Sequence, residues 1–216
     1  LSFGGSYNDD SGFALLLSFS ERNFLGRGQG LSVNIESGAE TADTSFSFTE
    51  PAFLGRDLTF GFDVAYRTTS FDDASYDTKV TSLSPSLAFP TGENSRLKFY
   101  YEAALEDIRN VAADASPIIA AEAGEQFRSA VGYNYTLDLL RGGLNPNRGV
   151  RLSFGQEIAG LGGDVEYLRT RAFAVAQRDI LNEEFTIRAI FEAGMIDSLG
   201  GGTSRVTDRF FLTSRQ

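Results

Sequence analysis

The sequence predicts an all-β protein, an antiparallel up-and-down transmembrane β-barrel. Three observations lead to this fold class. Apolar and polar residues alternate with a period of two along about eleven segments, which is the pattern of strands with one buried face. Many segments run for nine to twelve residues, close to the length of a tilted strand that crosses a bilayer. The mean hydropathy is only −0.15, as expected when apolar residues occupy every second position.

The alternation is clearest in the expected strand over residues 58–67. Leu58, Phe60, Phe62 and Val64 share one face, and polar or small residues fill the other. No segment approaches the roughly 18 consecutive apolar residues of a transmembrane helix, and no helix is expected. The eleven expected strands cover residues 1–7, 12–20, 31–36, 44–49, 58–67, 79–89, 97–105, 127–137, 149–158, 165–176 and 184–196.

A soluble β-sandwich would show the same alternation, because its apolar faces pack between two sheets. Strand length favours the membrane barrel over that alternative. In a barrel, the wet face of the strands lines the interior, and here it carries both signs of charge. We interpret these residues as an ionic network along a water-filled lumen rather than as a selectivity filter. They are Arg67, Lys98, Glu102, Arg128, Arg151, Arg169, Arg171, Arg188 and Glu192.

The connections between the expected strands differ in charge. Alternate connections, at residues 8–11, 36–44, 70–79, 106–125 and 160–165, are strongly acidic, whereas the others are nearly balanced. Alternate connections of a meander share one rim, so one rim is expected to be acidic. The longest connection, 106–125, lies on this rim, which we therefore expect to face outward. The apolar residues of this connection suit a loop that caps the barrel or faces lipid better than a loop that lines an ion pathway.

Composition excludes several function classes. The chain has 19 Lys+Arg against 29 Asp+Glu, a formal charge of −10 that argues against nucleic-acid binding. It has no Cys and no His, so disulfides and Ser-His or Cys-His catalysis are excluded. The acid pairs Asp9-Asp10, Asp72-Asp73 and Glu183-Glu184 lie in expected connections, where solvated charge is the default. We expect no enzyme activity, no cofactor and no metal or catalytic residues.

Eleven is an odd number of strands, so the two chain ends would emerge on opposite sides of the membrane, whereas bacterial single-chain barrels have even strand counts. The sheet would also have two unpaired edges in lipid, where orphan backbone groups are costly. The sequence after residue 198 begins a loop and ends without a closing strand, and no secretion signal precedes Leu1. We therefore expect the chain to be a segment of a longer polypeptide.

Two turns are specific enough to suggest a family. The stretch Ser20-Glu21-Arg22-Asn23-Phe24-Leu25-Gly26-Arg27-Gly28-Gln29 resembles the hallmark turn between the second and third barrel strands of BamA-type outer-membrane protein assembly factors, the bacterial surface antigen family. Thr49-Glu50-Pro51-Ala52-Phe53-Leu54-Gly55 resembles their next periplasmic turn. Asn145-Pro146-Asn147-Arg148-Gly149, where the family more often has a Pro-Thr-Arg-Gly-like sequence, and Gly160-Leu161-Gly162-Gly163-Asp164 extend the similarity. Arg209, Phe210 and Phe211 resemble the stem of the family's sixth extracellular loop.

This resemblance implies the domain organisation, location and partners. Residues 1–216 would form the N-terminal part of a sixteen-stranded barrel domain and end in the sixth extracellular loop, with periplasmic POTRA domains and closing strands outside the chain. The location would be the bacterial outer membrane. Partners would be outer-membrane lipids, unfolded outer-membrane protein clients and, through regions outside this chain, assembly-complex lipoproteins. Arg22, Asn23, Phe24, Leu25, Gly26, Arg27 and Gly28 form the hallmark turn.

The family's function would be insertion of client barrels through a lateral seam. The first strand, Leu1, Ser2, Phe3, Gly4, Gly5, Ser6 and Tyr7, is short, and glycine inside a strand weakens its pairing. We expect this strand to be the movable edge of the seam, where client strands pair by strand addition. The alternatives are a related TamA-like or two-partner secretion transporter and, from a different class, a passive outer-membrane porin.

Overall fold

The computed structural model describes residues 2–8, 12–38, 41–70, 76–113, 115–140, 148–180 and 185–199. Within them it contains eleven β-strands, one short α-helix and one 3₁₀ turn. The strands are β1 (Ser2–Asn8), β2 (Gly12–Phe24), β3 (Gln29–Ser37), β4 (Thr41–Glu50), β5 (Thr59–Thr69), β6 (Asp77–Gly92), β7 (Ser95–Arg109), β8 (Gly124–Asp138), β9 (Gly149–Ala159), β10 (Tyr167–Ile180) and β11 (Phe185–Ser198). The helical elements are η1 (Phe53–Gly55) and α1 (Pro117–Ala121).

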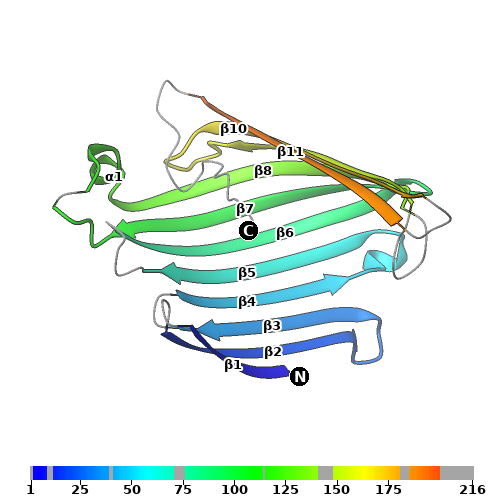
Figure 1. Cartoon of the computed structure of the whole chain (residues 1–216), viewed down its shortest axis with the longest axis horizontal. Coiled ribbons are helices and arrows are strands. Elements are labelled where there is room, and N and C mark those ends of the chain that lie inside the picture. The colour runs from blue at the N-terminus through cyan, green and yellow to red at the C-terminus, as the bar shows by residue number, and fades with distance from the viewer. Residues whose placement is uncertain are drawn as a thin grey trace.

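All eleven strands form one sheet in chain order, and every neighbouring pair is antiparallel. Figure 1 shows the strands lying side by side from β1 at the bottom to β10 and β11 at the top. The predicted number of strands and their up-and-down order are therefore confirmed. Since each strand reverses direction, the β1–β2, β3–β4, β5–β6, β7–β8 and β9–β10 connections share one rim, as the alternation of connections predicted.

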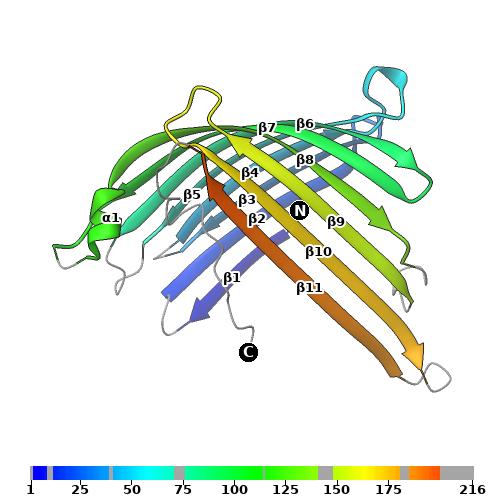
Figure 2. The same cartoon turned by 90° about the horizontal axis from the view of Figure 1, so that it is seen from above.

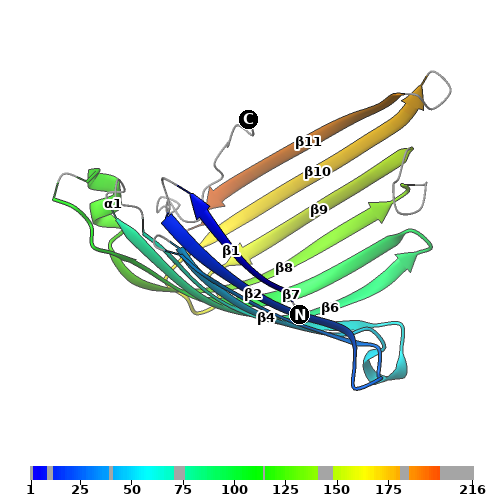
Figure 3. The same cartoon turned by 60° about the horizontal axis from the view of Figure 1, so that its bottom comes forward.

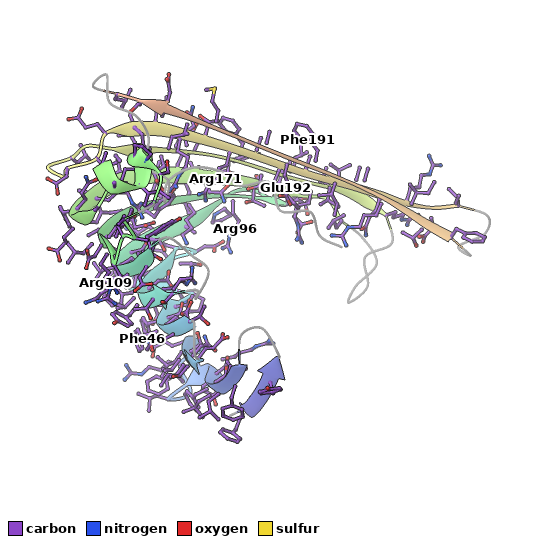
Figure 4. All side chains as sticks on the ribbon, turned by 60° about the vertical axis from the view of Figure 1, so that its left-hand side comes forward. Phe46, Arg96, Arg109, Arg171, Phe191 and Glu192 are labelled. Atoms are coloured by element: carbon purple, nitrogen blue, oxygen red, sulfur yellow. The ribbon has the colours of Figure 1, made fainter. Side chains whose placement is uncertain are left out.

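The sheet curves into an open trough whose edges are β1 and β11 (Figure 2, Figure 3). The two faces of the strands carry different side chains, as the period-two pattern predicted. In Figure 4, Phe46 and Phe191 lie on the convex side, whereas Arg96, Arg171 and Glu192 lie on the concave side. The apolar face is thus the outside of the curve and the charged face lines its interior, which is the arrangement of a membrane barrel wall.

Several strands extend further than the alternation alone predicted. Acidic residues assigned to the acidic connections lie inside strands instead: Asp43 is in β4, and Glu106 and Asp107 are in β7. The physical reason is that Asp43 and Glu106 have cationic partners on the neighbouring strand, Arg67 and Arg128, so the ladder continues where charge density indicated a loop. Of the acidic rim as predicted, Asp9, Asp10, Glu40, Asp72, Asp73 and Asp114 lie outside the described residues.

Two short helical elements were not expected. The helix α1 spans five residues of the long connection, and η1 forms the turn between β4 and β5. β7 continues to Arg109 and β8 begins at Gly124, so the connection is shorter than the 106–125 of the prediction. No helix in the described ranges is long and apolar enough to cross a membrane.

One close approach depends on a glycine in the concave face. Gly132 on β8 is paired with Tyr100 on β7, and the Tyr100 ring lies across it. A Cβ atom at Gly132 would come within 2.5 Å of the Tyr100 ring and 2.9 Å of the Gln156 carbonyl oxygen on β9. Gly132 is therefore the position that allows Tyr100 to reach across β8.

Replacing Gly132 by alanine is expected to destabilise the barrel by about 1–3 kcal/mol, because the new methyl group collides with a backbone oxygen that cannot move freely. The measurement is the urea midpoint of the full-length protein in detergent. Gly30→Ala is the matched control, since its Cβ would meet only the Thr49 Cβ at an ordinary 3.6 Å. Equal losses in the two variants would contradict the steric explanation.

Candidate functional site

The register of the sheet places all nine charged residues predicted for the lumen on its concave face. Through the cross-strand pairs, Arg67 on β5, Glu102 on β7, Arg128 on β8 and Arg169 on β10 occupy the same face. Arg188 and Glu192 of β11 follow on that face. The concave surface between β6 and β11 forms a polar hollow of about 850 Å³, lined by Lys98, Glu102, Arg128, Arg169, Arg171 and Glu192 among others.

Arg128 is the centre of the network. Its side chain is only 8% exposed, and its guanidinium donates to Glu102 Oε1 at 2.7 Å and to Glu106 Oε1 at 2.9 Å. It also donates to the Tyr167 hydroxyl oxygen at 3.4 Å. Burying a charge is tolerated when it is paired and its donors are satisfied, and Arg128 meets both conditions. The guanidinium thereby connects β7, β8 and β10.

Glu157 on β9 is a second centre, one strand further. Its carboxylate accepts hydrogen bonds from the hydroxyls of Tyr100 and Tyr167, each at 2.7 Å, and it pairs with Arg169. Tyr100 belongs to β7, so its side chain crosses over β8 to reach β9. This is the interaction that the missing side chain of Gly132 permits. The network therefore ties four consecutive strands, β7 to β10, through side chains as well as through the backbone.

Sequence reasoning identified the arginines and Glu102 but missed Glu106, Glu157, Tyr100 and Tyr167 as partners. The alternation did place Tyr100 and Glu106 on the wet face of their strand. The alternation could not predict the register between strands, and the register decides which side chains are in contact. Two simpler pairs, Arg67 with Asp43 and Arg151 with Asp138, are each at 2.6 Å and largely solvent-accessible. The predicted ionic network is confirmed for these pairs and for the Arg128 and Arg169 contacts.

Two acids of the hollow are held by hydrogen bonds, since Glu102 accepts one from Arg128 and Glu157 accepts one from Tyr167. Among the described residues, no group of three or more Asp or Glu side chains is arranged to hold a metal ion. The arrangement suits a water-filled interior with a stiff, ion-paired wall.

The connection between β9 and β10 covers an otherwise free stretch of β8. The amide of Gly160 donates to the Ser129 carbonyl at 3.1 Å, and the amide of Asp164 donates to the Phe127 carbonyl at 2.7 Å. In return, the Phe127 amide donates to the Asp164 carboxylate at 2.8 Å. Asp164, predicted as part of an acidic rim, thus caps backbone groups of a strand edge.

The two turns that carry the family resemblance share the same backbone conformation. Both contain the sequence Phe-Leu-Gly-Arg, at residues 24–27 and 53–56. Leu25 and Leu54 adopt positive φ angles of 55° and 57°, followed by Gly26 and Gly55 at 71° and 69°. Both leucine side chains are about three-quarters exposed. A left-handed leucine is strained, so each turn is held in place by its surroundings.

In the first of these turns the surrounding contact is Asn23. Its side-chain oxygen accepts a hydrogen bond from the Gly28 amide at 2.6 Å, and its backbone oxygen accepts one from the Gly26 amide at 2.9 Å. Gln29 then donates to Glu50, which connects this turn with the second one. Arg22 and Asn23 lie within β2, while residues 25–28 make the reversal.

The predicted gate strand corresponds to β1, except that Leu1 lies outside the described residues. Ser2 to Asn8 pair with β2 from Ser18 to Gly12, and β1 is an edge of the described sheet. Phe3 and Tyr7 are 77% and 73% exposed on the convex side. The predicted sixth-loop stem, Arg209, Phe210 and Phe211, also lies outside the described residues.

Replacing Arg128 by methionine is expected to cost about 3–5 kcal/mol of unfolding free energy, because it leaves Glu102 and Glu106 without their cation in a nearly closed site. Arg67→Met is the matched control and is expected to cost no more than about 1 kcal/mol, since its side chain is 65% exposed. Urea unfolding of the full-length protein in detergent measures both. Similar losses would show that the network contributes no more than a surface pair.

Replacing Asn23 by alanine is expected to destabilise the first turn by about 0.5–1.5 kcal/mol, because the Gly28 amide loses its acceptor. Asn23→Asp keeps an acceptor oxygen at the same place and is expected to retain most of the stability. The hydrogen-exchange rate of the Gly28 amide measures the stability of the turn directly. Unchanged protection of this amide in the alanine variant would contradict the assigned role of Asn23.

Comparisons with known proteins agree with this fold. The Omp85 superfamily domain matches residues 23–215. Outer membrane protein assembly factor BamA of Neorickettsia risticii is 28% identical over 98% of this chain and 29% of its own length. BamA of Nitratidesulfovibrio vulgaris is 25% identical over 97% of this chain and 26% of its own length. A sorting and assembly machinery component 50 homolog of Bos taurus is 26% identical over 96% of this chain and 45% of its own length.

A solved structure shares the fold. BamA from Haemophilus ducreyi lacking POTRA domains 1–3 superposes with a TM-score of 0.75 at 20% sequence identity, over 92% of this chain and 41% of that one. This match confirms the predicted barrel fold, and the chain spans less than half the length of these relatives. These relatives and the family locate the protein in the bacterial outer membrane. The chain belongs to the Omp85 superfamily.

Proposed function

We propose that the protein assembles and inserts β-barrel proteins into the outer membrane, and that it does so through a lateral seam beside β1. The observation that carries the proposal is the edge strand itself. In the described sheet β1 pairs with β2 alone, and two of its described residues, Gly4 and Gly5, are glycines. The similarity to assembly factors supports this function.

The glycines of β1 make its pairing weaker still. Gly4 and Gly5 have no side chain with which to pack against a neighbouring strand. A Cβ atom at Gly5 would lie 3.5 Å from the Phe13 ring of β2, and the glycine forgoes this contact. Glycine also loses more backbone entropy on pairing than other residues do. A glycine-containing edge therefore separates from a partner strand at lower cost than one with packed side chains.

Such an edge offers what an unfolded client needs. Its free N–H and C=O groups pair with an incoming strand, which in a membrane removes the penalty of orphan backbone groups. The exposed rings of Phe3 and Tyr7 give the incoming strand an apolar row on the lipid side. Strand addition needs no bond-making, so the proposal includes no catalytic residue, cofactor or metal.

The surrounding protein is part of the proposal. We infer that closing strands complete a sixteen-stranded barrel and that periplasmic domains precede β1 in the whole polypeptide; the inference is supported by the relatives being longer than this chain, which spans only part of each. Accessory lipoproteins would be met by those regions, whereas client strands would pair at β1. The acidic rim of the β1–β2 and β3–β4 connections would face outward.

A disulfide between β1 and the last strand of the full-length protein is expected to block client insertion. The chain has no cysteine, so one partner can be introduced at Gly4 without competing thiols from this segment. Insertion of a radiolabelled client into proteoliposomes is measured before and after reduction, and reductant should restore it.

The matched control is Ser2→Cys with Ser18→Cys. These residues are cross-strand partners, so their disulfide ties β1 to β2 and leaves the seam free. Client insertion should then proceed as in the unmodified protein. Undiminished insertion with the seam disulfide closed would refute the lateral seam, and loss in both variants would indicate general damage to the strand.

A further inference from the structure

The convex face carries an apolar notch that the proposed function does not use. It has a volume of about 370 Å³ and lies over β5, β6, β7 and β8. Its walls on the convex side are the side chains of Phe60, Pro85, Leu87, Phe99, Tyr101 and Val131. All six stand on the face that the sheet turns toward lipid.

The notch coincides with a break in the backbone ladder. β6 and β7 pair from Asp77 to Leu83 and again from Ser86 onward in the same register, but Ser84 and Pro85 have no ladder partner on β7. Proline has no N–H to donate, and its ring replaces the side chain that another residue would extend outward. A proline at the centre of an interior strand therefore leaves a depression in the convex surface of the sheet.

Two aromatic side chains on β7 lean away from this place. The Tyr101 hydroxyl is hydrogen-bonded at 3.0 Å to Ser129, which lies two residues from its direct partner Val131 toward the β7–β8 connection. Phe99 packs in the other direction, with its ring centroid 6.2 Å from Phe89 and 6.4 Å from Tyr133. The diverging rings leave the short side chains of Pro85 and Val131 uncovered between them.

The position of the notch across the thickness of the membrane indicates the chemistry of its occupant. Pro85 and Val131 stand near the middle of β6 and β8, where the surroundings are hydrocarbon rather than headgroups. The hollow extends toward the rim that carries η1, because Phe60 is the second residue of β5 and its ring stacks on Phe53 of η1 at 5.1 Å. A chain descending from that rim would reach the notch.

We propose that this notch is a binding site for one acyl chain of a phospholipid from the leaflet on the η1 side. The site is independent of the lateral seam. A polar ligand would lack partners in an apolar hollow, and water would lack the two to four polar contacts it needs. A protein strand finds no free edge here, because β6 and β7 are each paired on both sides. A flexible hydrocarbon chain satisfies the shape by dispersion contacts alone.

Native mass spectrometry of the full-length protein tests the proposal. The protein is purified in detergent, depleted of lipid and incubated with palmitoyl-oleoyl phosphatidylglycerol. One retained lipid per protein is expected. Val131→Phe fills the hollow from β8, so the acyl chain loses its dispersion contacts with the notch. The retained fraction should fall by about tenfold, as the binding constant does. Leu87→Phe fills it from β6 and should act in the same way.

Val33→Phe is the matched control, because Val33 stands on the convex face of β3 away from the notch. It should retain the lipid as the unmodified protein does. Heat-modifiable gel mobility identifies variants that fold. Equal retention in all folded variants, or no retained lipid in the unmodified protein, would overturn the site. Retention of purified lipid A in preference to the phospholipid would overturn the choice of lipid.

Discussion

Pairing of backbone groups between neighbouring strands is the constraint on which the rest of this structure depends. Hydrocarbon offers no hydrogen-bond partner, so each strand must satisfy its N–H and C=O groups through the next strand. The eleven-stranded meander follows from this, because adjacent segments joined by short turns find each other first. The same constraint explains why the β9–β10 connection folds back onto β8, where it pairs the Phe127 and Ser129 carbonyls and the Phe127 amide.

The side chains divide the wall into two mechanically different regions. From β7 to β10, Arg128 and Glu157 connect four strands through buried ion pairs and tyrosine hydrogen bonds. At β1, two glycines leave the backbone ladder almost alone in holding the described part of the strand. Breaking a paired, buried charge is costly, whereas parting a glycine-containing edge costs less. The lateral opening that we propose would need one stiff wall and one weak edge, and this distribution of contacts is consistent with it.

The sequence predicted the strands and their faces well because alternation is a local property. The residues of one face, such as Arg128 and Arg169, could be grouped without knowing any contact. Strand ends were less predictable: Glu106 was assigned to a loop by its charge, although Arg128 holds it in β7. Helix α1 and turn η1 were missed because five and three residues are too few to show a helical period.

By itself, then, the sequence determined the all-β class, the number and order of the strands, and which side of the sheet is wet. These follow from a period of two and from turn residues at close spacing, both of which act within a few residues of chain. Only the tertiary structure decided the partners. That Tyr100 crosses Gly132 to reach Glu157, or that Pro85 lies beside diverging rings, depends on the register between different strands of the sheet. Register is a property of pairs of strands, and no single strand carries it.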